Sequence, residues 1–165
     1  MNAKVTEHIL AFGHPNIRAI HPTTLMFTKD KHISKKGDCI VAVAADKALA
    51  DLSPEFRHAL KQPNAKLTII IEAEGEKEQV NAAGSPKLVL THQTEMVVRK
   101  SDYISDRTLA IHANKASSDL PRPFIAKLQN PMQEVKITLT VQAYATLASK
   151  TTWDSKGAVS RILLA

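Results

Sequence analysis

The sequence predicts an α+β fold in which two pseudo-twofold, duplicated βββαβ units form a closed or nearly closed eight-stranded β-barrel with two helices. Two observations support this prediction. Residues 7–73 align with residues 78–141 with a single gap of three residues, so the chain contains an internal repeat. Eight short strands in open sheets would also leave edge strands with unpaired main-chain N–H and C=O groups, and closure into a barrel removes such edges. The alternative is a two-layer α+β sandwich with both helices on one face.

The strands of the first half are predicted from apolar segments. These segments are Glu7–Phe12, Thr24–Thr28, Cys39–Val43 and Leu67–Ile71. The run Cys39–Val43 is continuously apolar, as is typical of a strand buried on both faces. A helix is expected to begin after Ser53, a favoured N-cap residue that is followed by proline in the first turn. It is expected to end near Pro63.

The second half repeats this order. Its predicted strands are Gln79–Ala83, Glu95–Arg99, Thr108–His112 and Val135–Val141, and its predicted helix is Leu120–Leu128. Apolar and polar residues alternate over Val135–Val141, which indicates a strand with one buried and one solvent-exposed face.

The chain of 165 residues fits one compact domain. We expect a single duplicated domain over residues 1–143, with halves at about 5–73 and 76–143, and a C-terminal appendage over residues 144–165. The appendage contains Trp153 and an apolar end at Ile162–Leu164. It is expected to add a strand or a helix that docks through Trp153, or to serve in assembly with a partner. The alternative is a mobile tail.

Composition limits the classes of function. The net charge of +6 can attract phosphate-bearing partners, and it is also ordinary for a lysine-rich soluble protein. An aromatic content of 4% argues against a stacking platform for single-stranded nucleic acid. One cysteine excludes an internal disulfide framework. No signal peptide and no apolar run of membrane-spanning length is present, so a cytoplasmic location without membrane contact is expected. No motif indicates a cofactor or a metal.

Polar residues shared by the two halves are the candidates for function. His21 and His92 each begin a His-x-Thr motif that ends at Thr23 or Thr94. Two histidines related by a twofold axis can face one pocket, where they would serve as general acid and general base. The alternative is that each histidine binds a neighbouring loop carbonyl and orders a turn.

Two lysine–aspartate pairs are also shared, each with a spacing of four residues. They are Lys47 with Asp51 and Lys115 with Asp119. On a helical turn each pair would form a salt bridge, with Asp46 and Asn114 as N-caps. The exposed amides of such a turn, with a lysine beside them, would hold a phosphate or a carboxylate. The alternative is a capped connector that precedes the main helix.

The halves differ most around Gly37. The repeat aligns the segment Lys35–Cys39 with Asp106-Arg107, which suggests asymmetric specificity residues. Asp38 and Asp106 are either carboxylates in one pocket or solvated acids in loops. Cys39 is either a buried small apolar residue or a thiol activated by the adjacent lysines. The predicted catalytic residues are His21, His92, Asp38 and Asp106. The predicted ligand-binding residues are Thr23, Thr94, Lys47, Lys115, Arg107, Lys36 and Lys100.

These residues favour a protein that binds an anionic partner, either structured RNA or a phosphorylated ligand. A small enzyme with a His/Lys/Asp site on the pseudo-twofold axis is the second hypothesis. An assembly or interaction protein is the third. The oligomeric state is left open by the sequence.

Several short motifs together resemble a known family. They are Gly13-His14-Pro15-Asn16-Ile17, His21-x-Thr23-Thr24, Gly37-Asp38-Cys39-Ile40, Ala45-Asp46-Lys47-Ala48, Thr91-His92-x-Thr94, Lys100-Ser101-Asp102, Arg107-Thr108-Leu109-Ala110 and Asn114-Lys115-Ala116. Over roughly residues 5–143 the chain resembles the archaeal domain-of-unknown-function family 371. The resemblance implies an archaeal, cytoplasmic, single-domain protein and no particular reaction. Lys35-Lys36 stands where the family pattern has proline and arginine, so Lys36 would supply charge without a bidentate fork.

Overall fold

The computed structural model describes residues 2–144, 149–153 and 159–163. The first set of elements is β1 (Asn2–Phe12), β2 (Thr24–Thr28), β3 (Ile40–Ala42), the 3-10 turn η1 (Leu49–Asp51), α1 (Pro54–Leu60) and β4 (Lys66–Ala73). The same order follows in β5 (Glu76–Ala83), β6 (Glu95–Arg99), β7 (Thr108–Ala110), η2 (Ser117–Asp119), α2 (Arg122–Leu128) and β8 (Glu134–Tyr144). A hairpin of β9 (Ser149–Trp153) and β10 (Val159–Leu163) comes last.

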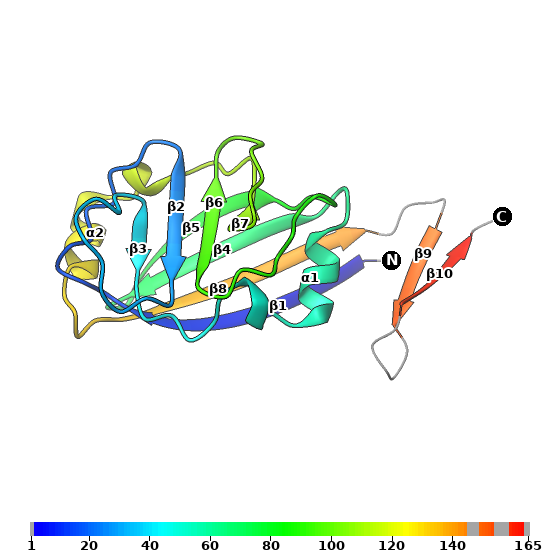
Figure 1. The fold of residues 1–165 in the computed structure, drawn as a ribbon, viewed down its shortest axis with the longest axis horizontal. Coiled ribbons are helices and arrows are strands. Elements are labelled where there is room, and N and C mark those ends of the chain that lie inside the picture. Colours follow the sequence, from blue (N-terminus) through cyan, green and yellow to red (C-terminus); the bar gives the residue numbers. More distant parts are fainter. Residues whose placement is uncertain (1, 145–148, 154–158, 164–165) are drawn as a thin grey trace.

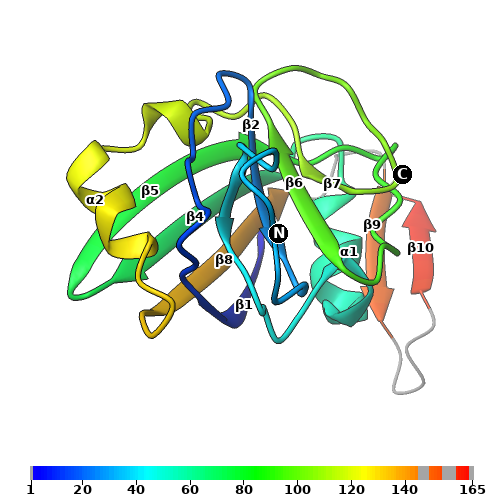
Figure 2. The same cartoon turned by 60° about the vertical axis from the view of Figure 1, so that its left-hand side comes forward.

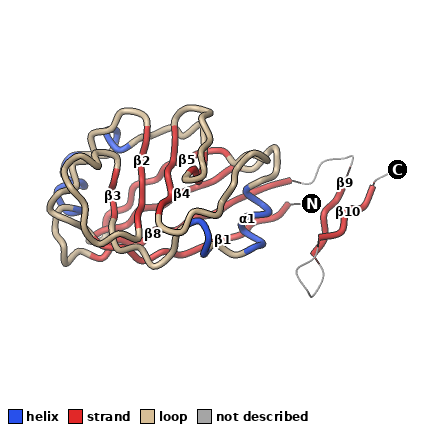
Figure 3. Tube along the Cα trace, in the orientation of Figure 1, coloured by secondary structure: helices blue, strands red, loops and turns tan. Residues whose placement is uncertain are grey.

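The first eight strands form two four-stranded sheets that pack face to face (Figure 1). The long sheet has the order β1-β8-β4-β5 and is antiparallel throughout. The short sheet has the order β3-β2-β6-β7, with an antiparallel centre and a parallel pair on each side. In the tube view the strands of the short sheet cross in front of the long sheet (Figure 3).

The prediction of a closed or nearly closed eight-stranded barrel was wrong, although the α+β content is as expected. No sheet in the described part of the chain closes on itself. Among the described residues, one isolated bridge at each pair of sheet edges connects the two sheets. Phe12 bridges to Val43 on one side, and Ala83 bridges to Ile111 on the other. A single bridge is not a ladder of successive hydrogen-bonded pairs, so the two sheets remain separate and form two layers.

The short outer strands explain why the sheets do not close. Strands were predicted over Cys39–Val43 and Thr108–His112, but β3 and β7 have only three residues each. Ala44 and His112 adopt a left-handed backbone with φ of 53° soon after these strands, and this conformation cannot continue a strand. Strands of three residues cannot pair along the length of β1 or β5, which have eleven and eight residues.

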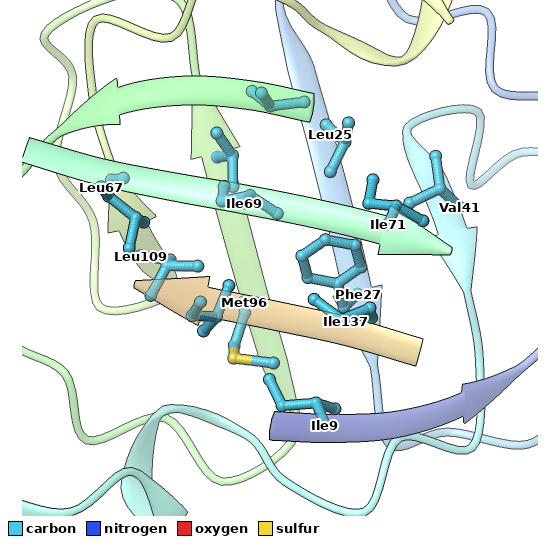
Figure 4. Packing of buried hydrophobic residues seen from close by; sticks show 14 of the residues in the cluster. Ile9, Leu25, Phe27, Val41, Leu67, Ile69, Ile71, Met96, Leu109 and Ile137 are labelled. Carbon is cyan, nitrogen blue, oxygen red and sulfur yellow. The ribbon is translucent and has the colours of Figure 1, made fainter. Parts of the chain in front are cut away.

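The core lies between the two sheets. Leu25 and Phe27 of β2 point toward Ile69 and Ile71 of β4 and Ile137 of β8 (Figure 4). The helices add Phe56 and Phe124, both of which are buried in the same core. In β4 and β8 buried residues alternate with more exposed ones, which confirms the alternation predicted for Val135–Val141.

The first strand of each half ends against the helix of the other half, at opposite sides of the molecule (Figure 2). A Cβ atom on Gly13 would meet the Leu128 carbonyl oxygen of α2, and one on Gly84 would meet the Leu60 carbonyl oxygen of α1. The residue after each glycine donates its main-chain N–H to that same carbonyl, at 2.9 and 3.1 Å. Glycine is required at both positions because the backbone and the helix end approach so closely.

The C-terminal segment forms the hairpin of β9 and β10. It has no ladder with either four-stranded sheet among the described residues. The expected docking through Trp153 concerns a side chain that lies outside the described residues. Within the described residues, no helix has both the length and the apolar character that crossing a bilayer requires.

Candidate functional site

The two predicted catalytic histidines have the same local geometry. In each, the ring Nδ1 accepts the main-chain N–H groups two and three residues further on, at 3.1 and 3.0 Å for His21 and at 3.2 and 3.0 Å for His92. An Nδ1 that accepts N–H groups carries no proton, so we assign the neutral tautomer with the proton on Nε2. In this state each ring orders its own turn and presents a hydrogen-bond donor at its free edge.

The structure does not bring the two histidines together. His21 precedes β2 and His92 precedes β6, and these neighbouring strands are antiparallel (Figure 1). Thr24 at the start of β2 lies opposite Arg99, whereas Glu95 at the start of β6 lies opposite Thr28. The two strand starts are therefore four residues apart along the sheet, or about 14 Å. One small substrate cannot span that distance between two rings.

Each histidine loop instead contacts the 3-10 turn of the other half. The Ala50 N–H donates to the His92 carbonyl at 3.0 Å, and the Ser118 N–H donates to the His21 carbonyl at 3.1 Å. The main-chain N–H of Lys29 likewise donates to the Thr94 carbonyl at 2.8 Å. The predicted polar residues therefore meet in two separate groups, at opposite ends of the β2–β6 pair.

The first group contains the Asp51 cluster, which we define as Glu7, Lys29, Lys47 and Asp51. Lys29 Nζ lies 2.8 Å from the Asp51 carboxylate, and Lys47 Nζ lies 3.8 Å from the Glu7 carboxylate. The Ala48 N–H also donates to Asp51 at 2.9 Å. These bonds attach the η1 turn to the end of β2.

The second group contains the Asp119 cluster, which we define as Glu78, Lys100, Lys115 and Asp119. Lys100 Nζ lies 2.7 Å from Asp119, and Lys115 Nζ lies 3.6 Å from Glu78. The Ala116 N–H donates to Asp119 at 2.8 Å. Both clusters pair each lysine with a carboxylate, so neither carries excess positive charge for a bound anion.

The hydrogen bonds in these clusters shift two carboxyl pKa values. The hydrogen bond from Lys29 lowers the pKa of Asp51 below its ordinary value of 3.8, and the Ala48 N–H lowers it further. Lys100 and then the Ala116 N–H lower the pKa of Asp119 in the same way. Both donors favour the charged carboxylate over the neutral acid.

The four-residue lysine–aspartate salt bridges predicted on a helical turn do not form. Lys47 pairs with Glu7 rather than with Asp51, because the chain is extended at Ala48, with φ −124° and ψ −170°. Extended backbone breaks the helical spacing on which an i,i+4 pair depends.

The side chains expected to cap these turns bind neighbouring strands. Asp46 Oδ1 accepts the Leu10 N–H at 3.0 Å, and Asn114 Oδ1 accepts the Asn81 N–H at 2.9 Å. Leu10 and Asn81 belong to β1 and β5, the two edge strands of the long sheet, so these side chains satisfy main-chain N–H groups on the outer edges of that sheet, which is a structural role.

The two predicted catalytic carboxylates, Asp38 and Asp106, lie near opposite edges of the short sheet. Asp38 is half-buried before β3, and Asp106 is exposed before β7, with β2 and β6 between these strands. Arg107 pairs with Glu95 at 2.7 Å, and this partner raises the arginine pKa. Lys36 is exposed, and no ion pair involves it among the described side chains.

The surroundings of Cys39 favour the protonated thiol. The side chain is partly buried and packs against the small cluster of Met26, Ile40, Val43 and Val97. Burial is the main cause that raises the pKa of Cys39, and a hydrogen bond with Thr24 only partly offsets it. A raised pKa reduces the thiolate that a nucleophile needs.

A hollow of about 180 Å³ lies away from all of these residues, near the turn between β4 and β5. Its lining consists of Glu72, Glu74, Gly75, Gln133, Glu134 and Lys136. No group of three or more potential metal ligands occurs in the part of the chain that the structure describes.

The sequence reasoning missed Glu7 and Glu78, the partners of Lys47 and Lys115. The repeat did contain the necessary information, because Glu7 aligns with Glu78 in the same way as the two lysines align. Glu7 begins the predicted strand Glu7–Phe12 and Glu78 directly precedes the predicted strand Gln79–Ala83, and neither is among the shared polar residues proposed as functional.

Comparison with known proteins agrees with the resemblance noted in the sequence. A family model with the description "Domain of unknown function (DUF371)" matches residues 9–142. The chain is also 45% identical over 122 residues to Uncharacterized protein MJ0206 of Methanocaldococcus jannaschii. The aligned region covers 73% of this chain and 89% of that protein. The chain therefore belongs to the archaeal domain family DUF371.

Proposed function

We propose that the protein binds an anionic partner that carries phosphate groups, either structured RNA or a phosphorylated ligand. The observation that supports this proposal most is a set of exposed lysines that form no ion pair with a described residue. They are Lys4, Lys31, Lys35, Lys36, Lys66, Lys77, Lys87 and Lys136. These side chains carry the positive excess of a chain with net charge +6.

The position of this excess changes which residues we propose as ligand contacts. Lys47, Lys100 and Lys115 are each matched by a carboxylate, and Arg107 is matched by Glu95. A polyanion would have to displace these carboxylates before it could use the same cations. Unpaired lysines bind phosphate without that competition and release counterions when they do so.

The geometry supports the enzyme hypothesis less well. A general base needs a free lone pair, and the Nδ1 lone pair of both His21 and His92 is used by main-chain N–H groups. The neutral ring then offers only the Nε2–H group, which suits a hydrogen bond to an anion better than proton transfer.

Equilibrium binding at several salt concentrations tests the proposal. We expect total cellular RNA, or a phosphorylated competitor, to bind with an affinity that falls linearly in a log–log plot against salt. Fluorescence anisotropy with labelled RNA and unlabelled nucleotides as competitors would distinguish the two partner types. Binding that does not depend on salt, or no binding to either type, would contradict the proposal.

We also infer that the chain arose by internal duplication. The order of elements in residues 2–73 recurs in residues 76–144, and the pairing registers support the inference. Met26 lies opposite Val97 in the short sheet, and Ile70 lies opposite Thr138 in the long sheet. Each of these pairs joins two positions that the sequence repeat aligns. A relative with a single half that assembles as a symmetric dimer would be direct support.

The assembly hypothesis concerns residues 144–165, most of whose side chains lie outside the described part of the structure. Deletion of these residues, followed by measurement of the oligomeric state, tests it.

A further inference from the structure

The long sheet has an outer face that no other element covers within the part of the chain that the structure describes. Alternate residues of its four strands point away from the core, and in the central strands these residues are partly exposed although they are flanked on both sides. The helices pack on the other side of the sheet, where Phe56 and Phe124 join the core. The outer face is therefore a solvent-exposed platform four strands wide.

The pairing registers arrange this platform in four rows that run from β1 through β8 and β4 to β5. The rows are Lys4-Gln142-Lys66-Ala83, Thr6-Thr140-Thr68-Asn81, His8-Thr138-Ile70-Gln79 and Leu10-Lys136-Glu72-Lys77. The two outer rows hold four lysines and one glutamate, and the two inner rows hold hydroxyl, amide and imidazole groups. We call this set of residues the outer platform.

The four lysines are spaced widely. Lys4 and Lys66 are two strands apart in one row, and Lys136 and Lys77 are two strands apart in the other, a distance of about 10 Å in each case. The two rows are six residues apart along the strands, or about 20 Å. None of the four forms an ion pair with a described residue.

This spacing indicates the size of the partner. A phosphorylated metabolite that binds one lysine pair would be too short to reach the other pair across two rows of uncharged residues. A chain of phosphates reaches both pairs, and its charge complements that of the platform.

The uncharged rows indicate which polyanion fits. They offer four threonine hydroxyls and one histidine across the centre, with amides at the β5 edge. Such groups bind phosphate oxygens and ribose 2′-hydroxyls. No Phe, Tyr or Trp lies within the four rows, and the exposed Tyr144 lies opposite Asn2, one step beyond the row of Lys4. The rows themselves therefore offer unstacked bases no aromatic surface.

From these observations we infer that the outer platform binds the sugar–phosphate backbone of base-paired RNA. The inference rests on the proposed function and gives it a location and a partner class. Duplex RNA keeps its bases stacked and presents regularly spaced phosphates and 2′-hydroxyls, which are the groups that the platform recognises.

The test compares two variants with the same loss of charge. The platform variant is K4Q/K66Q/K77Q/K136Q, and the control variant is K31Q/K35Q/K36Q/K87Q, which removes four exposed, unpaired lysines from loops outside the long sheet. Binding of a labelled RNA duplex is measured at several salt concentrations on full-length proteins whose thermal unfolding matches that of the wild type.

We expect the plot of log affinity against log salt to become less steep by about 3 to 4 units in the platform variant, since each phosphate contact contributes about 0.9 to the steepness. The control variant should keep most of the slope. Equal losses in both variants would overturn the inference in favour of net charge alone. Wild-type affinity in the platform variant would overturn it while the proposed function stands, and a wild-type protein that binds neither RNA nor phosphorylated ligands would remove both.

A second variant tests the choice of RNA without changing charge. Thr68→Val combined with Thr140→Val removes two hydroxyls and keeps the β-branched shape that the strands favour. It should lower affinity for an RNA duplex several-fold and lower affinity for the DNA duplex of the same sequence much less, because only RNA carries 2′-hydroxyls. Equal wild-type affinity for the two duplexes, or an equal effect of the variant on both, would overturn the assignment to RNA.

Discussion

At the scale of the residue, Asp51 and Asp119 each connect the end of a short-sheet strand to the start of a 3-10 turn. Each carboxylate accepts one lysine ammonium group and one main-chain N–H group. The carboxylates are two-fifths exposed, so the charge of each pair is partly screened by water. Their contribution should therefore appear mainly in the dependence of stability on pH.

The folded-state pKa of both carboxyls lies below the ordinary value of 3.8. Their contribution to stability is therefore present above about pH 4 and is lost as the pH falls through the lowered pKa. Replacing both with asparagine should reduce the loss of stability between pH 7 and pH 3, as measured by urea unfolding. A double variant with the wild-type pH profile would contradict the role assigned here.

His21 provides a second test, because asparagine and glutamine resemble different parts of imidazole. The Oδ1 of asparagine replaces the accepting Nδ1, whereas the Oε1 of glutamine reaches the position of Nε2. His21→Asn should stay within about 0.5 kcal/mol of the wild type, and His21→Gln should lose about 1 kcal/mol in chemical unfolding, since its turn loses an acceptor. The opposite order of stabilities would show that Nδ1 does not order the turn.

At the scale of the element, the close contact between Gly84 and the end of α1 fixes how strand and helix meet. Gly84→Ala places a methyl group against the Leu60 carbonyl oxygen and should destabilise the protein by about 1–3 kcal/mol. Gly13→Ala, which meets the Leu128 carbonyl, should have a similar cost. Thermal and urea unfolding measure both, and unchanged stability in either variant would mean that the helix end moves freely.

The turn between β4 and β5 offers a stabilising substitution. Glu74 and Gly75 have φ values of 51° and 78°, and positive φ at both central residues defines a type I′ turn. Asparagine followed by glycine is strongly favoured in this turn. Glu74→Asn should therefore raise the free energy of unfolding by about 0.5–1 kcal/mol, although it removes a 4.0 Å ion pair with Lys127. A lower melting temperature would contradict this expectation.

The sequence was sufficient for the order and type of the elements because that information is local. Alternation over Val135–Val141 and the serine–proline start of α1 are read from neighbouring residues, and both are present in the structure. The ends of β3 and β7 were not predicted because the left-handed conformations of Ala44 and His112 are imposed on residues that do not favour them. The pairing of Lys47 with Glu7 joins residues 40 positions apart, which no local pattern reveals.

At the scale of the whole molecule, the two-layer arrangement gives opposite environments to adjacent residues. Ile69 is fully buried between the sheets, whereas Ile70 lies on the outer platform and is partly exposed. Ile69→Val should cost about 1 kcal/mol, and Ile70→Val should change stability by less than about 0.5 kcal/mol. Urea unfolding of the two variants compares the same substitution on opposite faces, and equal costs would contradict the assignment of the faces.

The arrangement of the layers was the part of the fold that the sequence could not supply. Barrel closure depends on whether the outer strands can pair with each other, and the three residues of β3 and of β7 are too few. The platform was not predicted for a related reason. Lys4, Lys66, Lys77 and Lys136 are far apart along the chain, and only the registers of the long sheet place them on one face.

The crossed contacts of Gly13 and Gly84 have a consequence for the integrity of the chain. Because the first strand of each half ends against the other half's helix, each half depends on its neighbour to complete its buried surface. A protease that cleaved the hairpin at Glu74-Gly75 would separate the chain into two fragments, neither of which has a complete interior. The fragments would stay associated as a noncovalent pair and would come apart only when both lose their structure together.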